Sequence, residues 1–99
     1  MSRRPEPAAR AARQGDALVF AGALVRDAVA PLWPTALAAA AGAGRYDLRA
    51  VPRVDSAGLA LLAELAARAP GPVELAGSPD GLRELRAAYR LDPALRPAG

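Results

Sequence analysis

A carboxylate and a hydroxyl stand side by side in the run Asp55-Ser56-Ala57-Gly58, which follows a predicted strand and opens a predicted helix. In open α/β sheets the carboxyl ends of the strands face the binding crevice, so a small hydroxyl here would be exposed beside a helix N-terminus. Asp55 or Ser56 could instead only cap the helix, which either side chain does well. The spacing alone supports a binding site and a simple helix cap equally.

The chain lacks the residues that most enzymes use for nucleophilic or metal-assisted catalysis. It contains no Cys and no His, and its 13 basic side chains are all Arg. This composition removes the commonest zinc ligands, the usual general base, the Ser-His and Cys-His pairs, a Schiff-base amine and the lysine of a phosphate loop. We therefore expect a non-catalytic protein that uses neither a metal nor a cofactor.

The elements that would position the Asp55 run alternate between strand and helix. Short apolar runs bounded by Gly or Pro predict buried strands at 17–21, 45–51 and 72–76. Apolar residues at three- and four-residue steps predict helices between and after these strands. Residues 9–14 could add an edge strand, although Ala and Arg are poor strand formers. The alternation predicts an α/β fold with a small, mainly parallel β-sheet and about three to four helices.

Capping residues predict where the helices begin. Asp27 is expected to cap the first helix, and Asp55 or Ser56 to cap the second. Ser78 followed by Pro79 is a strong start signal for the third helix, because proline is favoured at the first helical position. In the second helix, the leucines at helical spacing are expected to be core residues, namely Leu59, Leu62 and Leu65.

The formal charge of +3 is concentrated before Gly15, where four Arg residues face a single acid, Glu6. From Asp16 onward nine Arg residues meet nine acidic residues, so the remainder is neutral. A basic lead-in on a neutral domain provides no groove that follows phosphates, and we expect no nucleic-acid partner. No apolar run reaches the roughly 20 residues that span a bilayer, and the first 14 residues do not resemble a secretory signal, so a cytoplasmic protein is predicted.

Residues 46–62, which read YDLRAVPRVDSAGLALL, resemble the signature of the STAS family. That signature is a hydrophobic strand ending in Asp-Leu, then Val-Asp-Ser/Thr-x-Gly-Leu and an apolar helix. Residues 21–24 and 73–77 match it as well, and the resemblance covers roughly residues 14–95. It implies a STAS-like fold over residues 9–96, preceded by a disordered basic lead-in at 1–8 and followed by a tail at 97–99.

The resemblance also implies a function for the Asp55 run. Within the family, residues 31–33 and 89–95 are similar to the STAS subunit of ABC-type phospholipid-transport complexes that maintain outer-membrane lipid asymmetry. The expected partner is the ATPase subunit and, through it, a membrane permease at the inner face of the inner membrane. Ser56 corresponds to the Ser/Thr position on which STAS domains depend. The implied partner-binding residues are Asp55, Ser56, Ala57, Gly58, Ala60 and Ala63.

The resemblance leaves a second function open, that of an anti-sigma factor antagonist in which Ser56 is phosphorylated by a partner kinase. Two departures from the family pattern bear on the docking surface. Val25 stands where a polar residue is usual, and Pro34 is expected to kink the first helix or delay its regular part. Trp33 suits either a core position or an interface.

Overall fold

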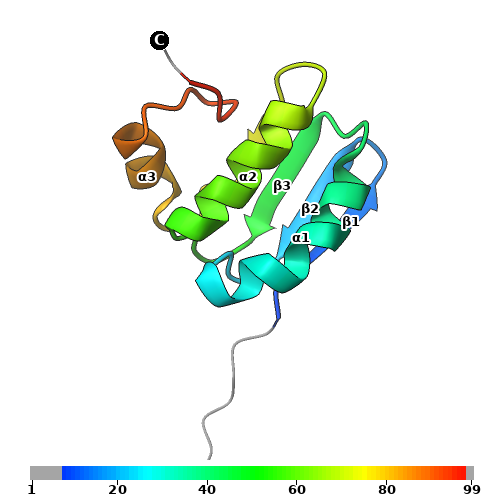
Figure 1. Cartoon of the computed structure of the whole chain (residues 1–99), viewed down its shortest axis with the longest axis horizontal. Coiled ribbons are helices and arrows are strands. Elements are labelled where there is room, and N and C mark those ends of the chain that lie inside the picture. Colours follow the sequence, from blue (N-terminus) through cyan, green and yellow to red (C-terminus); the bar gives the residue numbers. More distant parts are fainter. Residues whose placement is uncertain (1–7, 98–99) are drawn as a thin grey trace, which may run out of the picture.

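The computed structural model describes residues 8–97, which form a four-stranded sheet and three helices (Figure 1). The elements in chain order are β1 (Arg10–Gln14), β2 (Ala17–Ala21), α1 (Arg26–Ala40), β3 (Arg45–Ala50), α2 (Ser56–Arg68), β4 (Glu74–Ala76) and α3 (Leu82–Ala88). The sheet order is β1-β2-β3-β4; β1 is antiparallel to β2, and the other pairs are parallel. This architecture confirms the predicted fold class and the edge strand. Most of the predicted lead-in and tail lies outside the described residues.

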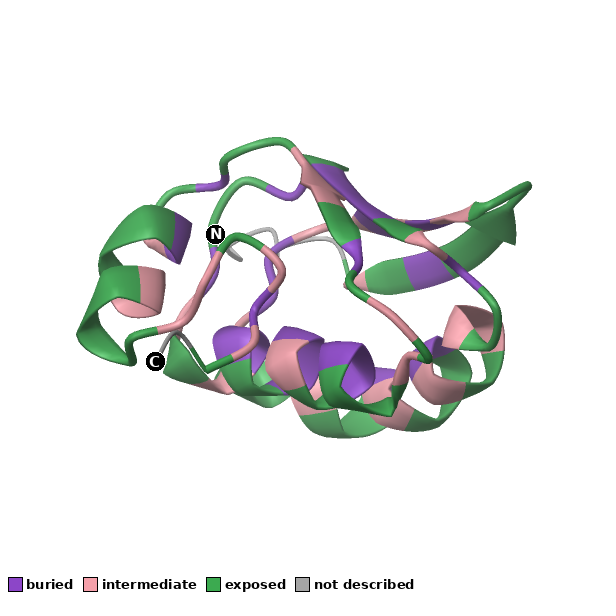
Figure 2. Ribbon diagram, turned by 90° about the horizontal axis from the view of Figure 1, so that it is seen from above, coloured by how far each residue is buried: buried purple, intermediate pink, exposed green. Residues whose placement is uncertain are grey.

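The helices α1 and α2 cover one face of the sheet, and the described elements leave the opposite face open (Figure 2). Because side chains alternate along a strand, Leu18 and Phe20 of β2 and Tyr46 and Leu48 of β3 all point toward the helices, where they are fully buried. Phe20 and Tyr46 meet edge to face with ring centroids 6.2 Å apart. The predicted core leucines of α2 are also buried.

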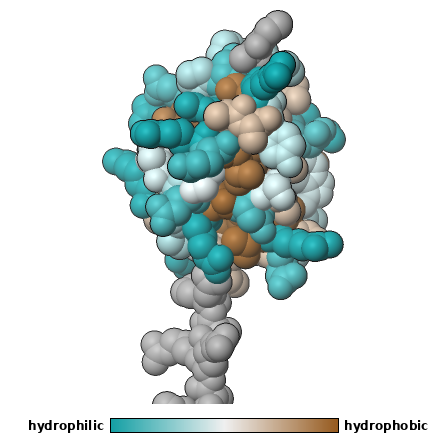
Figure 3. Space-filling view, turned by 90° about the vertical axis from the view of Figure 1, so that its left-hand side faces the viewer, coloured by the Kyte–Doolittle hydropathy of each residue, from teal (hydrophilic) through white to brown (hydrophobic). Residues whose placement is uncertain are grey.

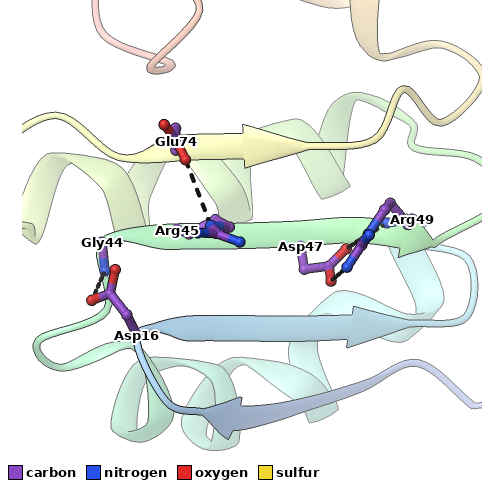
Figure 4. Close-up of polar contacts among 6 residues, drawn as sticks. All are labelled: Asp16, Gly44, Arg45, Asp47, Arg49 and Glu74. Carbon is purple, nitrogen blue, oxygen red and sulfur yellow. Dashed lines mark hydrogen bonds and ion pairs between the residues drawn. The ribbon is translucent and has the colours of Figure 1, made fainter.

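Two ion pairs occupy the open face of the sheet (Figure 4). Asp47 is held by Arg49, whose guanidinium lies 2.7 and 3.0 Å from the two carboxylate oxygens. The Arg49 side chain thereby covers Asp47, which is buried although no described helix packs on this face. Arg45 and Glu74 form a longer and more exposed pair at 3.6 Å between β3 and β4.

Helix starts agree with the sequence only in part. At α1 the capping position is Val25, which provides no side-chain hydrogen bond, so the predicted cap at Asp27 is wrong; Asp27 lies within the first turn. The helix also continues through Pro34 without interruption. α3 begins at Leu82 and not at Pro79, because the backbone of Asp80 pairs with Pro52 and Val54 before Gly81 turns the chain at φ +90°.

The placement of positive charge also differs from the sequence prediction. Arg10 and Arg13 belong to β1, so residues 8–97 carry eleven Arg residues against nine acids, and the expected neutrality of the folded part is wrong. The described helices include none with the length and apolarity needed to cross a membrane.

Candidate partner-binding site at the start of helix α2

The loops that leave the carboxyl ends of β2, β3 and β4 are joined to one another by backbone hydrogen bonds. Leu24 donates to Arg53 at 3.0 Å and accepts from Asp55 at 3.2 Å, while Val54 donates to Asp80 at 2.9 Å. These bonds continue the parallel ladder beyond the ends of the named strands. The residues that precede α1, α2 and α3 are therefore fixed relative to one another.

The carboxylate of Asp55 serves two helices at once. One oxygen accepts from the backbone N–H of Gly58 at 3.0 Å and so caps α2, and the other accepts from the N–H of Arg26 at 2.9 Å, at the first residue of α1. Both bonds satisfy N–H groups that a helix cannot satisfy internally. Of the two caps that the sequence allowed, the structure selects Asp55.

Electrostatics favour the ionised form of Asp55. Desolvation alone would raise the pKa of this carboxyl, but hydrogen bonds from the backbone N–H groups of Gly58, Arg26 and Ala57, together with the charge of Arg26, hold the pKa below its ordinary value. A negative charge is also favourable at helix N-termini. Asp55 is therefore a carboxylate at neutral pH, and its hydrogen bonds fix the start of α2 to the start of α1.

Gly58 allows α2 to approach the loop after β2. A Cβ atom at this position would lie 2.0 Å from the carbonyl oxygen of Leu24, much closer than any van der Waals contact permits. Gly58 is buried in the first turn of α2. The glycine in the Asp55 run is thus explained by packing, and it positions the neighbouring surface without contributing a side chain to it.

Ser56, by contrast, is exposed at the first position of α2. No hydrogen bond from its hydroxyl to another residue in the 8–97 range is present. Ala60 is exposed and Ala63 is half-buried. At spacings of four and three residues these side chains share one side of α2. Of the predicted site residues, Ser56 and Ala60 are exposed, Asp55, Ala57 and Ala63 are half-buried, and only Gly58 is buried.

The seam between α1 and α2 contains a pair that the sequence did not predict. Trp33 of α1 is half-buried against the core, and the guanidinium carbon of Arg68 lies 5.5 Å from the centroid of its ring. This distance is typical of a cation–π contact. Arg68 is also 3.5 Å from Glu64, one turn earlier in α2. Trp33 is thus both a packing residue and part of the helical surface.

A family model described as "Mlab, STAS domain" matches residues 8–97, which is the entire described part of the chain. The fold is therefore that of a STAS domain. The chain belongs to the MlaB family of STAS domains, as the sequence motif predicted.

Two relatives support this assignment. They are the proteins named intermembrane phospholipid transport system binding protein MlaB from Escherichia coli K12 and from Shigella flexneri. Each is 37% identical over 86 residues, which cover 84% of this chain and 89% of the relative. Both are named as binding proteins, in agreement with the predicted non-catalytic role.

Proposed function

We propose that this chain is the non-catalytic STAS subunit of an ABC-type intermembrane phospholipid-transport complex, in which it binds and supports the ATPase subunit. The membership of the MlaB family and the names of the two relatives support the transport system. Contact with the membrane permease is indirect, through the ATPase. The chain acts at the cytoplasmic face of the inner membrane and contributes to the lipid asymmetry of the outer membrane.

The observation that supports the proposed site is that Asp55, and not Ser56, caps helix α2. Because Asp55 caps α2, the Ser56 hydroxyl is not required for the helix and is free to contact a partner. The small side chains of Ala60 and Ala63 on the same side of α2 allow a partner to approach the helix closely. Residues 55–58, Ala60 and Ala63 thus form one docking surface, with Asp55 and Gly58 positioning the residues that make contact.

Substitutions at Ser56 test this surface. Ser56→Asp places a negative charge at a helix N-terminus, so the free energy of unfolding should change by no more than about 1 kcal/mol. In a docked interface the same carboxylate would be desolvated without a cation, and binding of the ATPase should be lost. Ser56→Thr keeps the hydroxyl and should bind normally, while Ser56→Ala measures the contribution of the hydroxyl itself.

Ser78→Asp is the matched control, since Ser78 is an exposed serine outside the α2 surface. Copurification with the ATPase and sensitivity of cells to detergent are the measurements. The proposal fails if Ser56→Asp is folded, retains the ATPase and leaves the envelope intact. If Ser56→Asp instead alters sigma-dependent transcription without an envelope defect, the anti-sigma factor antagonist is the better description.

A further inference from the structure

The outer edge of β4 presents backbone groups that are not used by the sheet. β4 is the last strand in the order β1-β2-β3-β4 of the described residues. Glu74 donates its N–H to Gly44 beside β3 at 2.9 Å, so Glu74 and Ala76 direct their backbone groups inward. Because these directions alternate along a strand, the N–H and C=O of Leu75 point away from the sheet.

A hollow of about 860 Å³ lies directly against this edge, between β4 and α3. Its volume is within the range of about 300–1,000 Å³ that is usual for ligand pockets. Leu75, Val73 and Leu82 contribute apolar lining, and Pro93 and Ala94 of the C-terminal segment also line it. Charged side chains surround this apolar part, namely Glu74, Asp80, Arg83, Glu84 and Arg86. Figure 3, which faces this side of the molecule, shows an apolar strip between polar side chains.

The side chains of β4 give the two faces of this edge different chemistry, apolar on one face and acidic on the other. Leu75 is in register with Tyr46 and points toward the helix layer. Glu74 is in register with Arg45 and lies on the open face, where its side chain is 79% exposed and its pair with Arg45 is long, at 3.6 Å. Glu74 is the one charged residue of β4, so a strand added here would meet a carboxylate on one side and, on the other, a hollow whose apolar part is formed by Val73, Leu75 and Leu82.

We propose that the β4 edge binds an extended segment of a partner protein as a fifth strand. The backbone of the segment pairs with the N–H and C=O of Leu75, in the manner of β-strand addition. Apolar side chains of the segment enter the hollow toward Leu82, and a basic side chain on the alternate side pairs with Glu74. This binding site is separate from the Ser56 surface and does not depend on the function proposed for it.

The test uses the full-length chain labelled with nitrogen-15 and two synthetic pentapeptides, Arg-Val-Arg-Val-Arg and Glu-Val-Glu-Val-Glu, blocked at both ends. The basic peptide should shift the amide resonances of residues 73–77 and 82–86 in a saturable manner. Because the Leu75 N–H gains an acceptor, its hydrogen exchange should slow by about tenfold or more at saturation. The acidic peptide should bind much more weakly.

Three variants connect these signals to the β4 edge. Glu74→Arg should reverse the preference between the two peptides. Leu75→Pro removes the outward donor while keeping the bonds of Glu74 and Ala76 to β3, and it should abolish the shifts that the basic peptide causes at the amides of residues 82–86. If this variant does not fold, the test rests on Glu74→Arg. Ser56→Asp should bind the basic peptide like the unmodified chain, which separates this site from the α2 surface.

The proposal is overturned if neither peptide binds, if the shifts fall on α1 and α2, or if the basic peptide binds without slowing exchange at Leu75. It is also overturned if raising the protein concentration without peptide protects Leu75, since the edge would then pair with a second copy of the chain. Protection that requires the basic peptide and disappears in Glu74→Arg supports it.

Discussion

The guanidinium of Arg13 in β1 donates a hydrogen bond of 3.2 Å to the carbonyl oxygen of Ala39, in the last turn of α1. It also donates to the carbonyls of Ala41 and Gly15. α1 has no basic residue in its own last turn, so Arg13 supplies from the sheet the positive charge that favours a helix C-terminus. The edge strand is thereby attached to the helix layer.

Arg13→Ala should lower the free energy of unfolding by about 1 kcal/mol, because it removes charge-assisted bonds that are partly open to solvent. The control is Arg10→Ala, three residues earlier in the same strand and exposed, which should change stability by less than about 0.5 kcal/mol. Urea unfolding of both variants measures the difference. Equal losses would mean that the bonds to α1 contribute nothing.

Gly58→Ala should be strongly destabilising, by about 1–3 kcal/mol or more, since the added methyl group would force α2 away from the Leu24 carbonyl. Gly71 provides a matched comparison. A Cβ atom at Gly71 meets nothing within 4 Å and its φ is not positive, so Gly71→Ala should be neutral or slightly stabilising. Thermal unfolding of the two variants tests the close approach, which is disproved if both behave alike.

Asp55→Ala removes acceptors from two helix N-termini, and a loss of about 2 kcal/mol is expected from cap energies of about 0.5–2 kcal/mol each. Asp27→Ala is the control, because Asp27 is an exposed acid in the first turn of α1 that caps nothing. Its removal affects only the helix dipole and should cost less than about 1 kcal/mol. Comparable losses measured by urea unfolding would contradict the double cap.

Acid should weaken the fold through Asp47. Side-chain and backbone hydrogen bonds from Arg49, opposed by some desolvation, lower the pKa of Asp47 from 3.8 to about 2. Since the folded-state pKa lies below the unfolded value, the stabilisation is complete above about pH 4 and is lost as pH falls toward 2. Urea unfolding at pH 5, 3 and 2 should show a smaller decline in Asp47→Asn and in Arg49→Ala. An unchanged decline in both variants would exclude this pair as a cause.

Local patterns in the sequence predicted the elements, because each depends on neighbours within a few residues. The strand at 17–21 and the second helix have the apolar spacing and bounding residues that their positions in the core require. The Ser78-Pro79 signal failed because Asp80 forms backbone bonds with Pro52 and Val54, 28 and 26 residues earlier in the chain. Tertiary pairing there overrode a good local start signal.

In the candidate site too, local patterns predicted some features and contacts between distant residues determined the others. The motif identified the Asp55 run, and capping preferences narrowed the cap to Asp55 or Ser56. The structure shows that Asp55 is the cap and that Ser56 is exposed, and it adds a second bond of Asp55 to Arg26, 29 residues earlier. Arg68 over Trp33 is likewise a contact between different helices. Pairings of this kind have no signature in the spacing of residues along one element.

Sharing one carboxylate between Arg26 and Gly58 also couples the dynamics of two helices. If the side chain of Asp55 rotates away, both amides lose their acceptor in the same event, so the first turns of α1 and α2 should fray together. Native-state hydrogen exchange at these two amides would then report a single opening free energy. A partner that binds α2 at Ser56 would consequently slow the hydrogen exchange of the first turn of α1 as well, although it need not touch that helix.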